Sequence, residues 1–168
     1  RVEVRISGLG GQGVVLAGQI LGRAAVFDSK NVVQTQSYGA EARGSGAKSE
    51  VIISDEKIGF PMVRKCDILV ALSQEAVDKN VKDLKEEGIL LIDDDNVKIV
   101  PETKAKVFKV HATRVAETVF KNKLYANMII LGALTKTTKV AREKSMEKAI
   151  EDSIPKKAVT INLQAFKK

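Results

Sequence analysis

Apolar and polar residues follow two alternating periods along this chain, which predict strands and helices in turn. Residues 2–6 form a short β-branched run, a glycine cluster follows, and from residue 12 to about residue 27 the apolar positions recur at helical spacing. Residues 31–36 and 49–54 have the composition of two further strands. The polar, glycine-rich segment 37–48 between them is too short to hold a crossover helix, so we expect an extended functional loop that joins antiparallel strands.

The second half of the chain continues the alternation and leads to a fold class. Continuous apolar runs over 67–72 and 88–92 are typical of strands covered on both faces, and a helical pattern over 74–87 separates them. The remaining elements are expected as short strands over 97–100 and 106–110, helices over 112–120, 125–135 and 141–150, and an ambiguous segment over 158–166. No linker or internal repeat divides residues 1–168. We therefore predict one α/β domain, a Rossmann-like open, mostly parallel sheet with helices on both faces.

The composition excludes several classes of protein. The chain has 168 residues, of which 44% are hydrophobic, enough for one globular core. No apolar run approaches the roughly 20 residues that span a bilayer, and residues 1–6 lack the apolar stretch of a signal peptide. We expect a cytoplasmic protein that does not bind a membrane. The single cysteine, Cys66, excludes an internal disulfide and leaves no thiolate set for an iron–sulfur cluster or a structural zinc, so any redox centre has to come from another chain.

Charge is distributed unevenly along the chain. The net charge is +7, yet residues 1–95 carry 12 basic and 15 acidic side chains, whereas residues 96–168 carry 16 basic and 6 acidic ones. The excess is mostly lysine at helical and loop spacing, and two Tyr and five Phe are the only aromatic side chains that could stack on bases. We interpret the basic half as a solvated or partner-facing surface and expect no nucleic-acid binding. The alternative, a nucleic-acid footprint, predicts binding that weakens steeply with salt.

A glycine-rich turn follows the first predicted strand. It reads Gly8-Leu9-Gly10-Gly11-Gln12-Gly13, and it has the glycine spacing of the dinucleotide fingerprint between a strand and a helix. Gly8 permits a tight turn, Gly10 lets the backbone approach a phosphate, and Gly13 lets the helix pack on the strand. The helix N-terminus offers free N–H groups and the positive end of its dipole to an anion. The candidate cofactor-binding residues here are Gly8, Gly10, Gly11, Gln12 and Gly13.

One part of a dinucleotide site is missing. In such a site the second strand ends in an acidic residue that holds the ribose hydroxyls. Here that strand ends Val33-Gln34-Thr35-Gln36, and Asp28 lies before it. The turn is therefore open to three interpretations: an anion or phosphate site, a complete nucleotide site, or a glycine turn used only for packing.

A second glycine-rich loop follows the second strand. Its sequence is Ser37-Tyr38-Gly39-Ala40-Glu41-Ala42-Arg43-Gly44-Ser45-Gly46, and we expect it at the same edge of the sheet as the first. Arg43 can fork onto a carboxylate or a phosphate, and Gly44 leaves room for a ligand or for a partner's backbone. Tyr38, Glu41, Arg43 and Gly44 complete the candidate site. The alternative is a solvent-exposed loop in which Glu41 pairs with Arg43.

The two loops together resemble a known family. The first loop, followed at this distance by Gln34-Thr35-Gln36-Ser37-Tyr38-Gly39-Ala40-Glu41-Ala42-Arg43-Gly44, is similar to the gamma subunits of 2-oxoacid:ferredoxin oxidoreductases, and among them to the 2-oxoglutarate branch. The resemblance continues through Ser49-Glu50-Val51-Ile52-Ile53, Asn127-Met128-Ile129-Ile130-Leu131-Gly132 and Asn162-Leu163-Gln164-Ala165-Phe166, and so spans nearly the whole chain. Ser45 stands where many relatives carry another glycine.

The resemblance implies one subunit of a complex. Such a complex oxidatively decarboxylates a 2-oxoacid with thiamine diphosphate and magnesium, passes the acyl group to coenzyme A, and sends two electrons through 4Fe-4S clusters to ferredoxin. The resemblance places thiamine diphosphate between alpha and beta subunits and the clusters in cysteine-rich chains, including a ferredoxin-like delta subunit. This chain would then bind no cofactor firmly by itself, and its glycine loops would shape the active-site region and contact coenzyme A phosphates.

No catalytic residue is assigned in this chain. The only histidine, His111, follows a predicted strand and has no obvious partner for nucleophile or base chemistry. The isolated chain is expected to be inactive, and no metal site is expected. A different class of function, a free-standing nucleotide-binding protein that uses the same glycine turn, remains the alternative, and titration of the isolated chain with NAD, NADP, FAD and ATP distinguishes the two.

Overall fold

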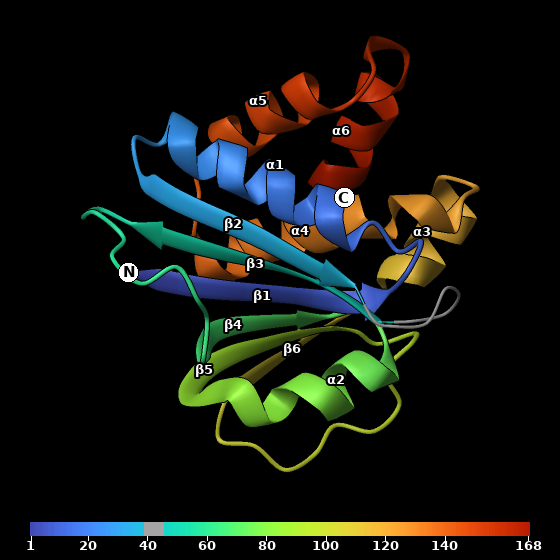
Figure 1. Cartoon of the computed structure of the whole chain (residues 1–168). Coiled ribbons are helices and arrows are strands. Elements are labelled where there is room, and N and C mark those ends of the chain that lie inside the picture. The colour runs from blue at the N-terminus through green and yellow to red at the C-terminus, as the bar shows by residue number, and fades with distance from the viewer. Residues whose placement is uncertain (39–45) are drawn as a thin grey trace.

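The structure is a computed structural model that describes residues 1–38 and 46–168. Over these residues one six-stranded sheet carries helices on both faces (Figure 1). The strands are β1 (Val2–Leu9), β2 (Asn31–Tyr38), β3 (Gly46–Ser54), β4 (Cys66–Ala71), β5 (Leu84–Asp93) and β6 (Lys106–Val110). The α-helices are α1 (Val14–Phe27), α2 (Gln74–Asn80), α3 (Ala112–Val119), α4 (Ala126–Thr138), α5 (Glu143–Ser153) and α6 (Val159–Lys167). Short 3-10 turns are η1 (Val81–Asp83), η2 (Lys123–Tyr125) and η3 (Lys156–Ala158).

The sheet is mixed, with parallel pairings in the majority. Its strand order is β2-β3-β1-β4-β5-β6. The pairs β1/β4, β4/β5 and β5/β6 are parallel, whereas β1/β3 and β2/β3 are antiparallel. The α/β class, the mostly parallel sheet and the antiparallel pairing of the two strands that flank the predicted loop are therefore confirmed. The loop is shorter than the predicted range 37–48, because β2 extends to Tyr38 and β3 starts at Gly46.

Two hydrophobic clusters hold the helices on opposite faces of the sheet. Alternation along β1 sends Val4 and Ile6 to one face, where α1, α3, α4, α5 and α6 pack. The other face packs against α2 through residues of β4 and β5, among them Leu69 and Leu90. Figure 1 shows α2 below the sheet, α1, α5 and α6 above it, and α4 behind β2 and β3. Among the described residues, no helix is long and apolar enough to cross a membrane.

A buried arginine fastens α2 and its 3-10 extension to the centre of the sheet. Arg5 of β1 is 3% exposed and pairs with Asp83 at 2.7 Å and with Glu50 of β3 at 3.0 Å. Its Nη1 also donates to Asn80 Oδ1 at 3.2 Å. Burial alone would lower the pKa of the Arg5 guanidinium, but Asp83 and Glu50 raise it above its ordinary value. The guanidinium therefore stays charged, and the network fixes the position of α2 over β1.

Three predicted elements differ in the structure. The helix predicted over 74–87 ends early, because Leu84 already pairs with Cys66 of β4 and starts β5. The charged residues 85–87 resemble the exposed face of a helix in the sequence, but they are part of β5. The strand predicted over 97–100 is wrong, since the Gln74 side chain accepts hydrogen bonds from the Lys98 and Ile99 N–H groups at 2.8 and 2.9 Å in place of a strand. The ambiguous segment 158–166 is mainly the helix α6.

Candidate functional site

The candidate site lies where the chain leaves β1 and β4 in opposite directions. After β1 the chain runs through α1 on one face toward β2, and after β4 it runs through α2 on the other face toward β5. In open α/β sheets, ligands bind outside the carboxyl ends of the strands at such a switch point. A hollow of about 720 Å³ occupies this position. It is lined mainly by the glycine turn, the first residues of α2, the end of β5 and the start of α3.

Gln12 closes the glycine turn on itself and ties it to β4. Its Oε1 accepts a hydrogen bond from the Leu9 N–H at 2.6 Å, and its Nε2 donates to the Leu72 carbonyl at 3.0 Å. A side chain on the buried Gly8 would meet Gln12 Oε1 at 2.5 Å. Gln12 and Gly8 therefore shape the turn, and the polar groups of the Gln12 side chain are already used by the protein itself.

Gly13 and Gly11 need the left-handed backbone for different reasons. Gly13 precedes α1 with φ 75°, and a Cβ there would lie 2.9 Å from Asn127 Cγ of α4 and closer still to Nδ2. Asn127 Nδ2 donates to the Gly13 carbonyl at 3.3 Å, so this contact joins α4 to the turn. Gly11 has φ 88° and open space beside it. Of the five predicted residues in this turn, Gly10 and Gly11 are the exposed ones that face the hollow.

The first turn of α1 is available to an anion. Within residues 1–38 and 46–168 no side chain caps this helix, and its first turn holds no acidic residue. The N-termini of α2 and α3 do have side-chain acceptors. In α2, Ser73 Oγ accepts from the Ala76 N–H at 3.1 Å. In α3, Asp93 accepts from the Thr113 N–H at 3.5 Å and Asp95 accepts from the Arg114 N–H at 2.7 Å. Within the described residues, α1 is the one of these three helices whose first-turn N–H groups have no side-chain acceptor.

The walls of the 720 Å³ hollow are acidic. Three carboxylates, from Glu75, Asp93 and Glu117, face it against one cation, Lys123. Burial raises the pKa of Asp93, which is 1% exposed, although hydrogen bonds from Thr113 oppose this shift. The carboxylate holds the start of α3 in place, because its Oδ2 accepts from Thr113 Oγ1 at 2.5 Å. This hollow therefore suits a polyanion poorly.

The second predicted loop leaves the sheet at the same edge as the first. Tyr38 of β2 lies opposite Ala47 of β3, and Ala47 lies opposite Gly8 of β1, so the three residues form one row across the sheet. The Tyr38 side chain is 66% exposed. The predicted site residues Glu41, Arg43 and Gly44 lie outside the described residues. The expectation that both loops emerge at one edge is nevertheless met at the residues that flank them.

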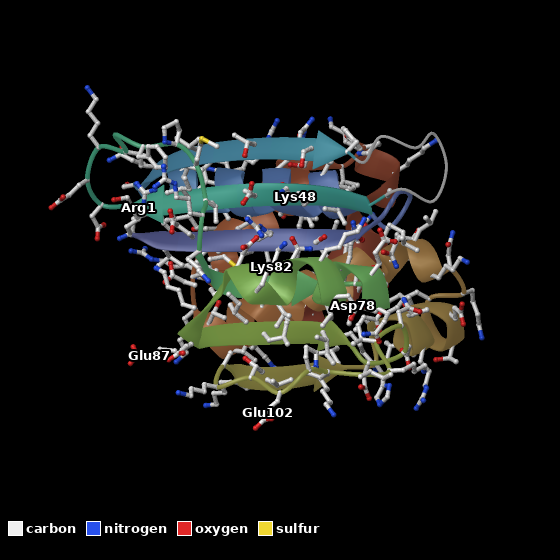
Figure 2. The ribbon with its side chains drawn as sticks, turned by 60° about the horizontal axis from the view of Figure 1, so that its bottom comes forward. Arg1, Lys48, Asp78, Lys82, Glu87 and Glu102 are labelled. Atoms are coloured by element: carbon white, nitrogen blue, oxygen red, sulfur yellow. The ribbon has the colours of Figure 1, made fainter. Side chains whose placement is uncertain are left out.

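A smaller, basic hollow of about 360 Å³ lies beside Tyr38, between α2 and the open face of β3. Its wall includes Ser37, Tyr38, Lys48 and Lys82. Ser7 and Asp83 also line it, but the Ser7 hydroxyl already donates to the Ala47 carbonyl at 3.3 Å and Asp83 pairs with Arg5. Figure 2 labels Lys48 and Lys82 on this face of the molecule. Neither lysine has an ion pair within residues 1–38 and 46–168. Hydroxyl and ammonium donors together suit a phosphate group.

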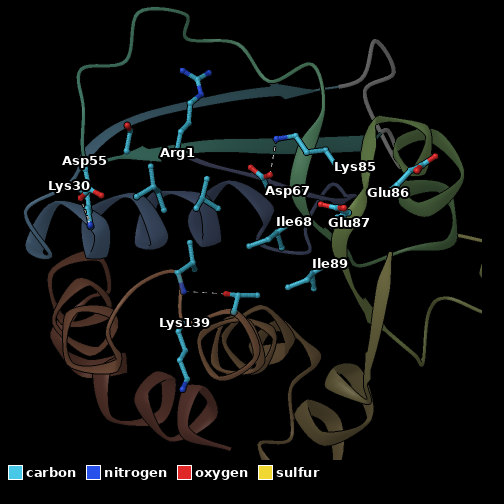
Figure 3. A pocket seen from close by; sticks show the side chains of 16 residues that line it. Arg1, Lys30, Asp55, Asp67, Ile68, Lys85, Glu86, Glu87, Ile89 and Lys139 are labelled. Carbon is cyan, nitrogen blue, oxygen red and sulfur yellow. Dashed lines mark hydrogen bonds and ion pairs between the residues drawn. The ribbon is translucent and has the colours of Figure 1, made fainter. Parts of the chain in front are cut away.

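The opposite edge of the sheet carries a larger hollow of about 910 Å³ (Figure 3). Its charges largely neutralise one another, because Lys85 pairs with Asp67 at 2.8 Å and Lys30 pairs with Asp55. Asp67 also raises the pKa of Lys85 through its hydrogen bond. This hollow lies at the amino ends of β1, β4 and β5, away from both glycine loops. We assign it no role in the candidate site.

Several residues that build the site were missed by the sequence reasoning. Asp93 has a recognisable signal, because it ends a buried parallel strand, where functional side chains gather. Lys48 and Lys82 gave no signal: they are isolated lysines far apart in the sequence, and only the packing of α2 beside β3 brings them to one hollow. The contact of Asn127 with Gly13 joins residues 114 positions apart and could not be inferred from spacing.

Comparisons with known proteins agree with this architecture. The family model described as pyruvate ferredoxin/flavodoxin oxidoreductase matches residues 3–168. A protein of Methanocaldococcus jannaschii named 2-oxoglutarate synthase subunit KorC is 54% identical over 100% of this chain and 91% of its own length. A protein of Pyrococcus furiosus named pyruvate/ketoisovalerate oxidoreductases common subunit gamma is 33% identical over 90% of this chain and 86% of its own. The crystal structure of a keto/oxoacid ferredoxin oxidoreductase gamma subunit from Geobacter sulfurreducens superposes with a TM-score of 0.88 at 43% identity, covering 99% of this chain and 94% of that one.

Proposed function

The chain belongs to the pyruvate ferredoxin/flavodoxin oxidoreductase family, and from this premise we propose that it is the gamma subunit of a 2-oxoacid:ferredoxin oxidoreductase. The complex would oxidatively decarboxylate 2-oxoglutarate, release the acyl-CoA and reduce ferredoxin. Support for 2-oxoglutarate comes from the name of the Methanocaldococcus relative. The match to that relative covers all of this chain. The partners would be alpha, beta and ferredoxin-like delta subunits, and the complex would act in the cytoplasm.

The choice of 2-oxoacid is assigned to other subunits. The Pyrococcus relative is named as common to pyruvate and ketoisovalerate oxidoreductases, two acids with different side chains. A gamma subunit shared in that way cannot itself discriminate between the acids. In this chain, too, the 720 Å³ hollow offers three carboxylates against one lysine, a charge balance that repels a 2-oxoacid.

The residues of this chain do not fit the redox cofactors. Its sequence has one cysteine, Cys66, which is buried and whose pKa burial raises to about 11. The described residues hold no group of three His, Cys, Asp or Glu side chains that could bind a metal ion. Thiamine diphosphate, magnesium and 4Fe-4S clusters are therefore assigned to the partner subunits. The isolated chain is expected to have no oxidoreductase activity.

The proposed role of this chain is to shape the coenzyme A side of the active-site region. The observation that carries it is the position of the basic hollow of Lys48 and Lys82 at the same sheet edge as the uncapped start of α1. Phosphate groups of coenzyme A suit the N–H groups of α1 and the two lysines. The acidic wall at Glu75 and Asp93 would keep the same phosphates away from the neighbouring hollow.

Steady-state kinetics of the purified complex test this role. The double variant Lys48→Ala/Lys82→Ala is expected to raise the KM for coenzyme A about tenfold or more, because each charge-assisted contact contributes about 1.5–3 kcal/mol, while the KM for 2-oxoglutarate stays unchanged. Lys109→Ala on β6 is the matched control, an exposed lysine at the far edge of the sheet. An unchanged KM for coenzyme A in the double variant refutes the role of the lysines. Arg43→Ala, assayed in parallel, tests the second loop, and loss of assembly alone would make Arg43 an interface residue.

A further inference from the structure

The strand β2 is an unprotected edge of the sheet. It forms the upper border of the sheet in Figure 2, and its eight residues pair with β3 in continuous register from Asn31 to Tyr38. The strand, Asn-Val-Val-Gln-Thr-Gln-Ser-Tyr, contains no charged residue and no proline, and its pairing has no register shift that would indicate a bulge. Natural edge strands are usually protected from further pairing by charges, prolines, bulges or short length. None of these devices is present in β2.

The other edge of the same sheet is protected in the usual way. The strand β6 is five residues long and reads Lys-Val-Phe-Lys-Val, with Lys106 and Lys109 both exposed. The Lys106 ammonium lies 5.3 Å from the centroid of the Phe108 ring and so partly covers it. Lysines on an edge strand oppose pairing, because a strand added there would have to desolvate them. The contrast within one sheet indicates that β2 is kept uncharged for a contact.

A groove runs beside β2, and its lining mixes apolar residues with the polar Gln19, Arg23 and Gln34. It holds about 480 Å³ between β2 and the outer face of α1. Val26 is 58% exposed and Phe27 is 37% exposed at its rim, and Val32 of β2 lies in its floor. A strand paired with β2 would place every second side chain over this groove, since successive side chains point to opposite faces of a sheet.

Arg23 is the one charged residue in the groove wall among the described residues. Arg23 of α1 lines it and has no ion pair among the described residues, and the Lys148 ammonium lies 4.4 Å from the centroid of the Phe27 ring. A second copy of this chain would present an identical β2 without a carboxylate, together with a second Arg23. Charge complementarity therefore favours a different chain that carries an acidic residue in its strand.

We propose that β2 binds an extended segment of a partner subunit, which adds a seventh strand to the sheet and places apolar side chains on Val26 and Phe27 and a carboxylate against Arg23. The segment is expected to alternate apolar residues on the groove side with polar residues on the other. This inference rests on the proposed function, because it assigns the strand to a subunit of the same complex. It adds an interface along β2, which meets the second glycine-rich loop at Ser37 and Tyr38.

Hydrogen–deuterium exchange compares the isolated chain with the complex purified with its other subunits. In the complex, the β2 amides that point away from β3 are expected to exchange about tenfold more slowly or better, whereas the exposed β6 edge is unchanged. Assembly of the complex with no protection of β2 overturns the inference and leaves the proposed function standing. Failure of the chain to assemble at all refutes both. Concentration-dependent protection of β2 in the isolated chain, with a doubled mass by light scattering, overturns the choice of a partner subunit in favour of a second copy.

Matched charge variants test the groove itself. Val26→Asp and Arg23→Glu are expected each to weaken assembly about tenfold or more, measured as the subunit concentration needed for half-maximal complex. Lys109→Glu changes the net charge as Arg23→Glu does, but on β6, and is expected to assemble normally. Circular dichroism and thermal unfolding of each isolated variant show whether the chain has folded. Equal assembly by Arg23→Glu and Lys109→Glu overturns the carboxylate contact.

Discussion

Alanine at Gly13 should destabilise the fold far more than alanine at Gly11, although both glycines have positive φ values. Gly11, at φ 88°, has open space around it, so Gly11→Ala introduces mainly backbone strain. An L residue in the left-handed region costs about 1–2 kcal/mol. Gly13, at φ 75°, carries the same strain, but its new Cβ would also lie 2.9 Å from Asn127 Cγ. The difference between the two variants therefore isolates the contact between the turn and α4.

The size of that difference follows from the contact. Asn127 must move, and it then loses its hydrogen bond to the Gly13 carbonyl, which contributes about 1 kcal/mol. Forcing extra volume into a packed site costs about 1–3 kcal/mol more. We expect Gly13→Ala to lower the free energy of unfolding by about 3 kcal/mol or more, compared with about 1 kcal/mol for Gly11→Ala. Both variants also gain about 0.5 kcal/mol of folding stability, because alanine lowers the conformational entropy of the unfolded chain, and this gain cancels when the two are compared.

Urea unfolding of the purified chain, followed by circular dichroism, measures both values. A double-mutant cycle with Asn127→Ala then tests the cause. Once the amide is removed, the added cost of Gly13→Ala should fall to about 1–2 kcal/mol, because the main steric partner is gone. Equal costs for Gly11→Ala and Gly13→Ala, or a Gly13→Ala cost that is the same in the Asn127→Ala background, would refute the reasoning.

Three further outcomes are expected. Arg5→Met should lower the free energy of unfolding in urea by about 3 kcal/mol, because it leaves Asp83 without its buried partner. Lys85→Met breaks a half-exposed pair with Asp67 and should lower the free energy of unfolding by less than about 1 kcal/mol. Similar losses of unfolding free energy in the two variants would contradict this. Iodoacetamide at pH 8 should alkylate Cys66 at least about a hundredfold more slowly in the native chain than in guanidinium, by mass spectrometry, because the thiol is buried and its pKa is about 11. The pKa of Asp93 is raised in the folded chain, so protonation of Asp93 favours the folded state. This contribution to the free energy of unfolding is full below the unfolded pKa of about 3.9 and is lost as pH rises through the folded pKa. Asp93→Asn should therefore flatten that part of the stability profile between about pH 3 and pH 7.

Periodicity in the sequence predicted the elements whose side chains face one environment along their length. The helix α1 and the strands β1 and β4 are of this kind, since their apolar positions recur at one spacing from end to end. Prediction failed where a segment changes environment midway. Residues 85–87 of β5 are exposed and charged, and the pairing of the buried Leu84 with Cys66 makes this part of the chain a strand. The backbone at Lys98 and Ile99 has side-chain partners from α2, which no local pattern can reveal.

The candidate site was predicted in its position but not in its chemistry. Strand order and the antiparallel pairing of β2 with β3 bring Tyr38 and Gly8 into one row, as expected from the two glycine loops. The sequence could not show that Gln12 would use its own polar groups within the turn. It also could not show that one hollow is acidic and its neighbour basic, because these balances depend on which side chains of distant elements share a wall.

The single core on the α1 face has a consequence for synthesis on the ribosome. Its buried residues run from Val4 in the first strand to Phe166 in the last helix. When β1 to β4 emerge, residues 126–168, which form α4, α5 and α6, are still to be made, so much of the apolar face of the sheet has nothing to cover it. Exposed apolar surface and unpaired strand edges make such a nascent chain prone to aggregation. The core on this face is therefore completed only after residues 126–168 have emerged, and that segment contributes no residue to either glycine loop.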